Sequence, residues 1–238
     1  VLHDDAFVIS VEDGSSVALE PSYFDKTNDY PAGHREQDYF VTVQNCGVTL
    51  DENGRKVLVT EDIRNGNGRT IKSRYSTPNR VDKIQEPIQS IFWIMKDDAL
   101  PPLVKITDPR LASILGCTLM TKRSNAENTG AGANLDALVI EPYANPFRVY
   151  PLVEDYEKFK ALFDKNVDCY IINTGDFLGK KVTKEVSLGV IETIVDGKAN
   201  FELFGGLPGM EYLPVEGYEV PEMSGDYAEL IRDRMQFR

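Results

Sequence analysis

The chain has few of the residues from which metal clusters, disulfide frameworks and nucleophilic triads are built. Its 238 residues include only 3 cysteines and 2 histidines. Cys46, Cys117 and Cys169 lie far apart, without the paired spacing of a zinc site or the even number of a disulfide framework. Neither His3 nor His34 has a catalytic partner that the sequence identifies. We therefore expect buried, reduced cysteines in a cytoplasmic protein, without a Ser/His/Asp or Cys/His catalytic set.

Basic residues and long apolar runs are also scarce. The chain has 26 Lys and Arg against 38 Asp and Glu, so its formal net charge is −12. A nucleic-acid backbone would be repelled by this charge, which argues against a nucleic-acid partner. No stretch approaches the roughly 18 apolar residues of a membrane span, which argues against a membrane partner. With 42% hydrophobic and 27% charged residues, the composition is that of a globular protein.

The first third of the chain predicts β-structure. Residues 6–11, 39–44 and 56–60 are apolar or β-branched segments typical of strands. Asn53-Gly54 precedes the third of these segments, and this dipeptide favours the positive φ angles of a type I′ hairpin turn.

From Ser90 onward the pattern changes to alternating strands and helices. The apolar runs at residues 91–95 and 167–172 predict buried strands, the first of them covered on both faces. Helices are expected from Asp108-Pro109 to Gly116, over residues 154–165, from Val186 to Gly197 and from Ser224 to Phe237. We therefore expect one mixed α/β domain over residues 1–238, with a mixed sheet, flanking helices, a β-rich part at 1–88 and an alternating part at 89–238.

Two groups of charged residues could carry chemistry. Asp4 and Asp5 stand at an expected strand end, where open α/β sheets place metal and phosphate ligands, although such a pair is also common in solvated turns. Positive charge is concentrated in a glycine-rich segment and its continuation, at Arg64, Arg69, Lys72, Arg74 and Arg80. Guanidinium groups there could bind phosphate or carboxylate, and the alternative is a solvated hairpin tip.

Several short blocks occur in an order that resembles a known family. They are Asp4-Asp5, then Lys26-Thr27, then Thr60-Glu61-Asp62-Ile63-Arg64, then Leu100-Pro101-Pro102, then Asn173-Thr174-Gly175 and Gly179-Lys180-Lys181. This succession resembles the C-terminal, nucleotide-side half of the ATP-dependent phosphoenolpyruvate carboxykinases and covers nearly the whole chain. The resemblance implies a carboxykinase-like C-terminal domain in a phosphotransferase that acts on a small carboxylic acid.

The resemblance also implies roles for individual residues. Asp5, with Asp4 beside it, would hold a divalent cation, Mg²⁺ or Mn²⁺, on the phosphates of ATP or another nucleoside triphosphate. Lys26 would lie near the phosphates, and Arg64 would steady the γ-phosphoryl group during its transfer. Arg80 is a second candidate for that role. Lys181 and Ser187 would line the adenine and ribose side. Such a site would use clustered cations and a metal, as phosphoryl transfer requires.

The chain departs from the family pattern at several positions. Pro21-Ser22 replaces paired glycines, Asp176 replaces an aromatic residue, and Lys181 replaces an arginine. The family's phosphate-binding loop and N-terminal domain would precede residue 1, and the chain begins with Val1 rather than Met, so we expect a fragment that needs the N-terminal part of the same protein as its partner. The departures leave open a non-catalytic, carboxykinase-like binding or regulatory module, and a plain α/β domain whose charged residues are only solvated.

Overall fold

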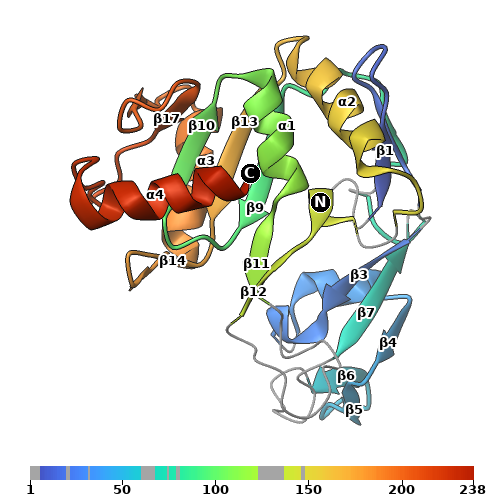
Figure 1. Ribbon diagram of the computed structural model, residues 1–238. Coiled ribbons are helices and arrows are strands. Elements are labelled where there is room, and N and C mark those ends of the chain that lie inside the picture. Colours follow the sequence, from blue (N-terminus) through green and yellow to red (C-terminus); the bar gives the residue numbers. More distant parts are fainter. Residues whose placement is uncertain are drawn as a thin grey trace. The chain divides into compact units, whose positions relative to one another are not determined.

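The computed structural model describes residues 6–19, 22–31, 33–59, 68–73, 75–78, 81–122, 137–145 and 148–238. The chain is a mixed α/β protein that divides into two compact units, Val1–Pro87 and Ile88–Arg238 (Figure 1). The division lies beside residues 88 and 89, where the sequence pattern changes.

The first unit is built from short antiparallel strands. They are β1 (Phe7–Ile9), β2 (Ser16–Ala18), β3 (Ser22–Lys26), β4 (Thr42–Gln44), β5 (Gly47–Leu50), β6 (Lys56–Val59), β7 (Arg69–Ser73) and β8 (Lys83–Ile84). They form two three-stranded sheets, β1-β2-β8 and β3-β7-β4, and the hairpin β5-β6. Two 3-10 helices, η1 (Thr27–Asp29) and η2 (Arg35–Tyr39), join β3 to β4. The strand expected from residue 39 therefore begins only at Thr42, because Tyr39 belongs to η2.

The turn predicted at Asn53-Gly54 is longer than a two-residue turn. Leu50 pairs with Lys56, so residues 51–55 form the loop between β5 and β6. Within it only Gly54 has a positive φ angle, of 73°. The Asp51 carboxylate accepts hydrogen bonds from the backbone N–H groups of Asn53 and Arg55, both at 2.8 Å. Asp51 thus stabilises an alternative to the predicted type I′ turn, and that prediction is wrong in detail.

The second unit contains a five-stranded mixed sheet and four helices among its described residues. The sheet strands are β9 (Ser90–Met95), β10 (Leu103–Ile106), β13 (Asp168–Asn173), β16 (Glu202–Leu203) and β17 (Met210–Tyr212), in the order β16-β17-β10-β13-β9. β11 (Met120–Lys122) pairs with β12 (Leu138–Ile140), and β14 (Asp176–Phe177) pairs with β15 (Lys180–Lys181). The helices are α1 (Pro109–Cys117), α2 (Leu152–Phe163), α3 (Lys184–Val195) and α4 (Gly225–Phe237), with a 3-10 turn, η4 (Pro142–Ala144), before α2.

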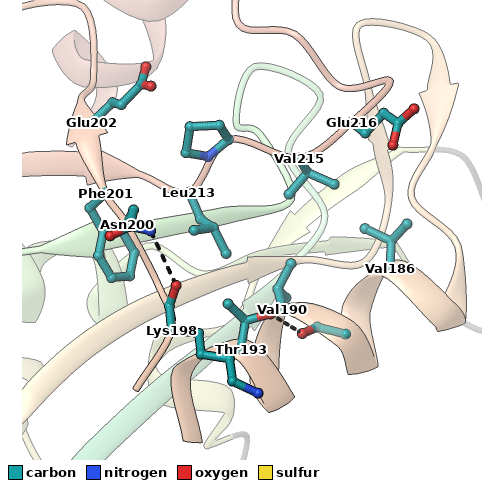
Figure 2. Close-up of a pocket in the computed structure, with 12 residues that line it drawn as sticks. Val186, Val190, Thr193, Lys198, Asn200, Phe201, Glu202, Leu213, Val215 and Glu216 are labelled. Atoms are coloured by element: carbon teal, nitrogen blue, oxygen red, sulfur yellow. Dashed lines mark hydrogen bonds between the residues drawn. The ribbon is translucent and has the colours of Figure 1, made fainter. Parts of the chain in front are cut away.

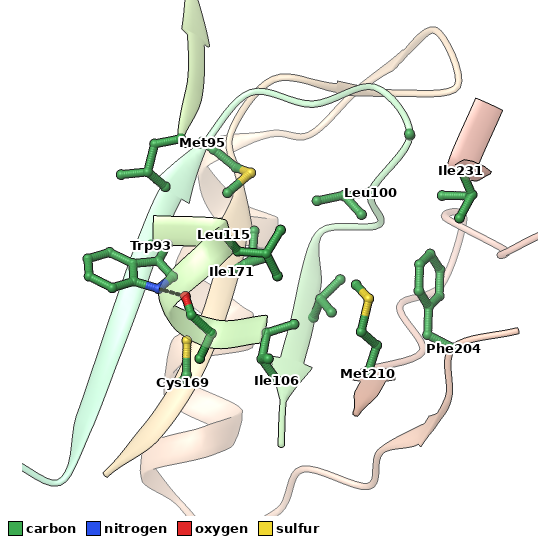
Figure 3. Packing of buried hydrophobic residues seen from close by; sticks show 14 of the residues in the cluster. Trp93, Met95, Leu100, Ile106, Leu115, Cys169, Ile171, Phe204, Met210 and Ile231 are labelled. Atoms are coloured by element: carbon green, nitrogen blue, oxygen red, sulfur yellow. Dashed lines mark hydrogen bonds between the residues drawn. The ribbon is translucent and has the colours of Figure 1, made fainter. Parts of the chain in front are cut away.

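Alternation along β13 divides the core of this unit into two layers. Cys169 and Ile171 belong to the larger cluster, to which α1, α2 and α4 also contribute. Figure 3 shows both residues in this cluster with Leu115 of α1 and Ile231 of α4. Tyr170 and Ile172 belong to the smaller cluster on the other face, which α3 covers with Val190. Since successive side chains of a strand point to opposite faces, a continuously apolar strand is required at this position.

The helix boundaries follow local signals. The Asp108 carboxylate caps α1 by accepting from the N–H groups of Arg110 and Leu111, and Pro109 occupies the first helical position. Both features confirm the predicted start of α1. Ser224 occupies the N-cap position of α4, but its side chain makes no capping hydrogen bond.

β9 differs from its prediction on one face. Trp93 and Met95 are buried, whereas Ile94 is 62% exposed. Among the described strands, β9 stands at the edge of the sheet and has one neighbouring strand. The prediction that both faces of β9 are covered is therefore wrong at Ile94. No helix within the described ranges is long and apolar enough to cross a membrane.

Candidate functional site

Asn173 joins two loops at one edge of the five-stranded sheet. β9 and β13 run parallel, so Met95 and Asn173 end them side by side. β10 runs antiparallel to β13, which brings Pro102, just before β10, to the same edge. The Asn173 side chain is fully buried, and its two N–H bonds are shared among the carbonyl oxygens of Asp97, Leu100 and Asp176 at 2.8, 2.6 and 3.0 Å. Its backbone N–H donates to the Pro102 carbonyl at 3.0 Å.

The acceptor side of the Asn173 amide completes this arrangement. Its Oδ1 accepts from the backbone N–H of Gly175 at 3.0 Å, which closes a tight turn after β13. A side chain at Gly175 would clash, because an added Cβ would lie 2.9 Å from the Cβ of Lys96. The Leu100-Pro101-Pro102 and Asn173-Thr174-Gly175 blocks are therefore held together at the carboxyl ends of two parallel strands, where open α/β sheets bind ligands.

Lys181 extends from the hairpin that follows this turn. Lys181 pairs with Asp176 between β14 and β15, and the connecting residues Leu178 and Gly179 have φ angles of 49° and 79°. The exposed Lys181 ammonium donates to the Thr174 carbonyl at 3.0 Å. The lysine that the resemblance assigns to the nucleotide therefore lies against the turn between β13 and β14.

Ser187 lies in the first turns of α3. Its hydroxyl donates to the Thr183 carbonyl at 3.1 Å, a bond to the residue four positions earlier. Thr183 is the N-cap of α3, and its hydroxyl oxygen accepts from the Val186 N–H. Lys181 and Ser187 thus both lie beside the start of α3, and each has a polar partner within the protein.

A buried carboxylate borders the same edge. Asp97 is fully buried and accepts from the guanidinium groups of Arg234 at 3.1 Å and Arg238 at 3.2 Å. Arg234 also contacts Asp98 at 2.9 Å. These ion pairs attach α4 to the loop between β9 and β10, and they are a structural role that the sequence analysis did not assign.

Lys26 lies in the first unit, at the end of β3. Its side chain is exposed, and its position in the sheet is opposite Arg69 of β7. This placement is compatible with an anion-binding lysine and equally with a solvated one.

Lys72 is buried, although a solvated basic segment was the expected alternative at this position. Its side chain is 2% exposed, and its ammonium lies 2.6 Å from Asp25 and 3.0 Å from Glu36. It also donates to the Tyr30 hydroxyl at 3.1 Å. Burial by itself lowers the pKa of Lys72, but the hydrogen bonds to Asp25, Tyr30 and Glu36 outweigh it and raise that pKa above its ordinary value. Lys72 is therefore a buried, ionised residue of the first unit.

The remaining candidate residues cannot be placed in this way. Asp4, Asp5, Arg64 and Arg80 lie outside the described residues. Within the described ranges, no group of three or more His, Cys, Asp and Glu side chains could hold a metal ion. All three cysteines are free; Cys117 and Cys169 are buried as expected, whereas Cys46 is only half-buried.

A separate groove of about 570 Å³ opens between α3 and residues 198–216 (Figure 2). Its lining residues are Val186, Gly189, Val190, Thr193, Lys198, Asn200, Phe201, Glu202, Leu213, Pro214, Val215 and Glu216. Asn173, Lys181 and Ser187 do not line it, although the groove reaches Val186, next to Ser187, at the start of α3.

The residues that organise this edge were not predicted as a site from the sequence. Asn173 was noted only as part of a block, Asp97 was not singled out, and Tyr218, whose hydroxyl donates to the Lys181 carbonyl at 2.5 Å, was not considered. An asparagine at the end of a predicted buried strand was the available signal for the first of these.

Comparison with known proteins finds no family model and no curated protein that matches this chain.

Proposed function

We propose that the chain forms the nucleotide side of a carboxykinase-like phosphotransferase that acts on a small carboxylic acid. The observation that supports this most is the bonding of Leu100-Pro101-Pro102 to Asn173-Thr174-Gly175, with Lys181 bonded to the same turn. These are three of the blocks that resemble the carboxykinases, and they meet at the sheet edge favoured for ligands. The proposed fold is accordingly the C-terminal domain of that family.

In this proposal the ligand is ATP, or another nucleoside triphosphate, with Mg²⁺ or Mn²⁺. Lys181 and Ser187 would contact the nucleoside, Lys26 and Arg64 the phosphates, and Arg80 is a second candidate for the phosphate side. Asp4 and Asp5 would hold the metal, which when bound supplies positive charge to the phosphate oxygens. The protein's own cations would orient the phosphates and stabilise the charge that develops during transfer.

Lys181 is better suited to a hydrogen bond with an anionic group or with an acceptor atom of the adenine ring than to stacking on that ring. Its ammonium is exposed and a directional donor, but it lacks the planar fork of arginine. As the resemblance implies, we propose that the N-terminal part of the same protein is the partner of this chain and supplies the other phosphate contacts, so that this chain alone is inactive.

One observation favours a second candidate, a non-catalytic binding or regulatory module of the same fold. The Lys181 ammonium and the Ser187 hydroxyl already have carbonyl partners, Thr174 and Thr183. Each group therefore keeps its position through a bond within the protein and needs no ligand to do so, as expected of a scaffold without catalysis.

Calorimetric titration of the full-length protein with Mn²⁺·ATP tests the proposal. We expect binding, and we expect Lys181→Ala to raise the dissociation constant about tenfold or more, because a charge-assisted hydrogen bond is lost. Lys198→Ala is the matched control, since Lys198 is an exposed lysine that pairs with the exposed Asp196, and the variant should bind nucleotide as the wild type does. Absence of binding by the wild-type protein would reject the phosphotransferase and favour the scaffold.

A further inference from the structure

Residues 215–219 form a short strap over the β14–β15 hairpin. The Tyr218 N–H donates to the Val215 carbonyl at 2.9 Å, and the Gly217 N–H donates to the Glu219 carboxylate at 2.9 Å. Gly217 has a φ angle of 78°, which favours glycine. These bonds give the strap a defined conformation of its own.

The two adjacent lysines of β15 contact different parts of the molecule. The Lys180 ammonium donates to the Gly217 carbonyl at 2.5 Å and lies 4.6 Å from the centre of the Tyr218 ring. A Cβ at Gly217 would lie only 2.8 Å from that ammonium, so the strap approaches Lys180 closely. Lys180 therefore holds the strap, whereas Lys181 points its ammonium to the turn after β13.

Tyr218 connects the strap to Lys181 itself. Its ring is 6% exposed within the larger core cluster, so it has little freedom to move. Its hydroxyl donates to the Lys181 carbonyl at 2.5 Å. Lys181 is thereby held by Tyr218 at its carbonyl, by pairing with Asp176 and by the Thr174 carbonyl at its ammonium.

We propose that Tyr218 is a positioning residue for the nucleotide, acting through Lys181. This inference rests on the proposed function. Ordering a backbone segment when a ligand binds costs free energy, and a hairpin whose backbone is already fixed avoids that cost. The Tyr218 hydroxyl touches no ligand in this proposal and contributes to affinity only by fixing the residue that does.

A double-mutant cycle on the full-length protein tests this inference. Dissociation constants for Mn²⁺·ATP are measured for the wild type, Tyr218→Phe, Lys181→Ala and the double variant. We expect Tyr218→Phe to raise the dissociation constant about two- to tenfold, the range for loss of one hydrogen bond. In the Lys181→Ala background, Tyr218→Phe should not change the dissociation constant further, because Tyr218 would affect affinity only through the Lys181 side chain. A purely structural role for Tyr218 would instead give equal effects in both backgrounds.

Tyr212→Phe is the matched control. Its hydroxyl donates to the Glu202 carboxylate at 2.8 Å on strands β16 and β17, away from the hairpin, so removing it should leave nucleotide affinity unchanged. An unchanged dissociation constant for Tyr218→Phe, with Lys181→Ala still weakening binding, would overturn the positioning role and leave the proposed function intact. Additive effects would also overturn it. If the wild type binds no nucleotide, the proposed function fails and the inference with it.

Discussion

The Asn173 side chain donates to the Asp97 carbonyl at 2.8 Å across 76 positions of sequence. This contact connects the loop after β9 to the turn after β13, and it is fully buried. A buried amide that donates hydrogen bonds to several carbonyl oxygens cannot be removed without leaving these acceptors unsatisfied. Asn173 is therefore the residue on which the geometry of this edge depends.

Asn173→Ala is expected to lower the free energy of unfolding of the second unit by about 2–4 kcal/mol, because buried carbonyls lose their donor. Urea titration followed by the fluorescence of Trp93, the only tryptophan in the sequence, measures the change within this unit. Asn200→Ala, at an exposed asparagine, should change stability by less than about 0.5 kcal/mol. Equal effects of the two substitutions would contradict the role assigned to Asn173.

Lys72→Met is expected to destabilise the first unit by about 3–5 kcal/mol, since Asp25 and Glu36 would lose their buried cation. Circular dichroism during urea unfolding measures this loss. Lys83→Met, at an exposed lysine of β8, removes the same charge and should have little effect. If Lys72→Met is as stable as Lys83→Met, the cluster is not a stabilising unit.

The predictions that succeeded rest on short-range signals. Asp108-Pro109 and the apolar periodicity identified α1, and the continuous apolar run identified β13, because capping and alternation are encoded by neighbouring residues. The charge pattern did not predict the burial of Lys72, because that burial depends on ion pairs with Asp25 and Glu36, which are far away in the sequence.

Only part of the candidate site could be predicted from the sequence. The blocks around Pro102 and Asn173 were identified by their order, but the hydrogen bonds between them join residues distant in the chain. The contact of Tyr218 with Lys181 spans 37 positions and has no local sequence signal. Long-range polar contacts of this kind come from the tertiary structure and have no periodicity.

Tyr170 should titrate late. Burial, together with the nearby Asp168 carboxylate, raises the pKa of Tyr170 from the ordinary value of 10.0 to about 12. Because the folded-state pKa is raised, its contribution to stability is complete below pH 10 and is lost as the pH rises through about 12. The pKa values of several other tyrosines are raised as well, namely those of Tyr30, Tyr143, Tyr150, Tyr212 and Tyr227. Absorbance titration should therefore show that Tyr170→Phe loses the amplitude of one phenolate from the transition near pH 12, and this variant should lose less stability over that interval. An unchanged late transition in Tyr170→Phe would contradict the assignment.

The three thiols should differ in reactivity toward a disulfide reagent at neutral pH. Cys46 is half-buried, whereas Cys117 and Cys169 are 9% and 1% exposed, and burial raises the pKa of both. We expect one fast thiol in the native protein and none in Cys46→Ser, with the other two reacting only on unfolding. A fast thiol that persists in Cys46→Ser would contradict the burial of the other two.

In the proposed function, a nucleotide binds where β9 and β13 end, beside Lys181. Amide hydrogen exchange of the full-length protein, with and without saturating Mn²⁺·ATP, tests it most directly because it reports location as well as binding. We expect slower exchange in peptides covering residues 173–184 and unchanged exchange in residues 198–203, which include residues that line the groove beside α3. Protection confined to the groove, or no protection at residues 173–184, would contradict it.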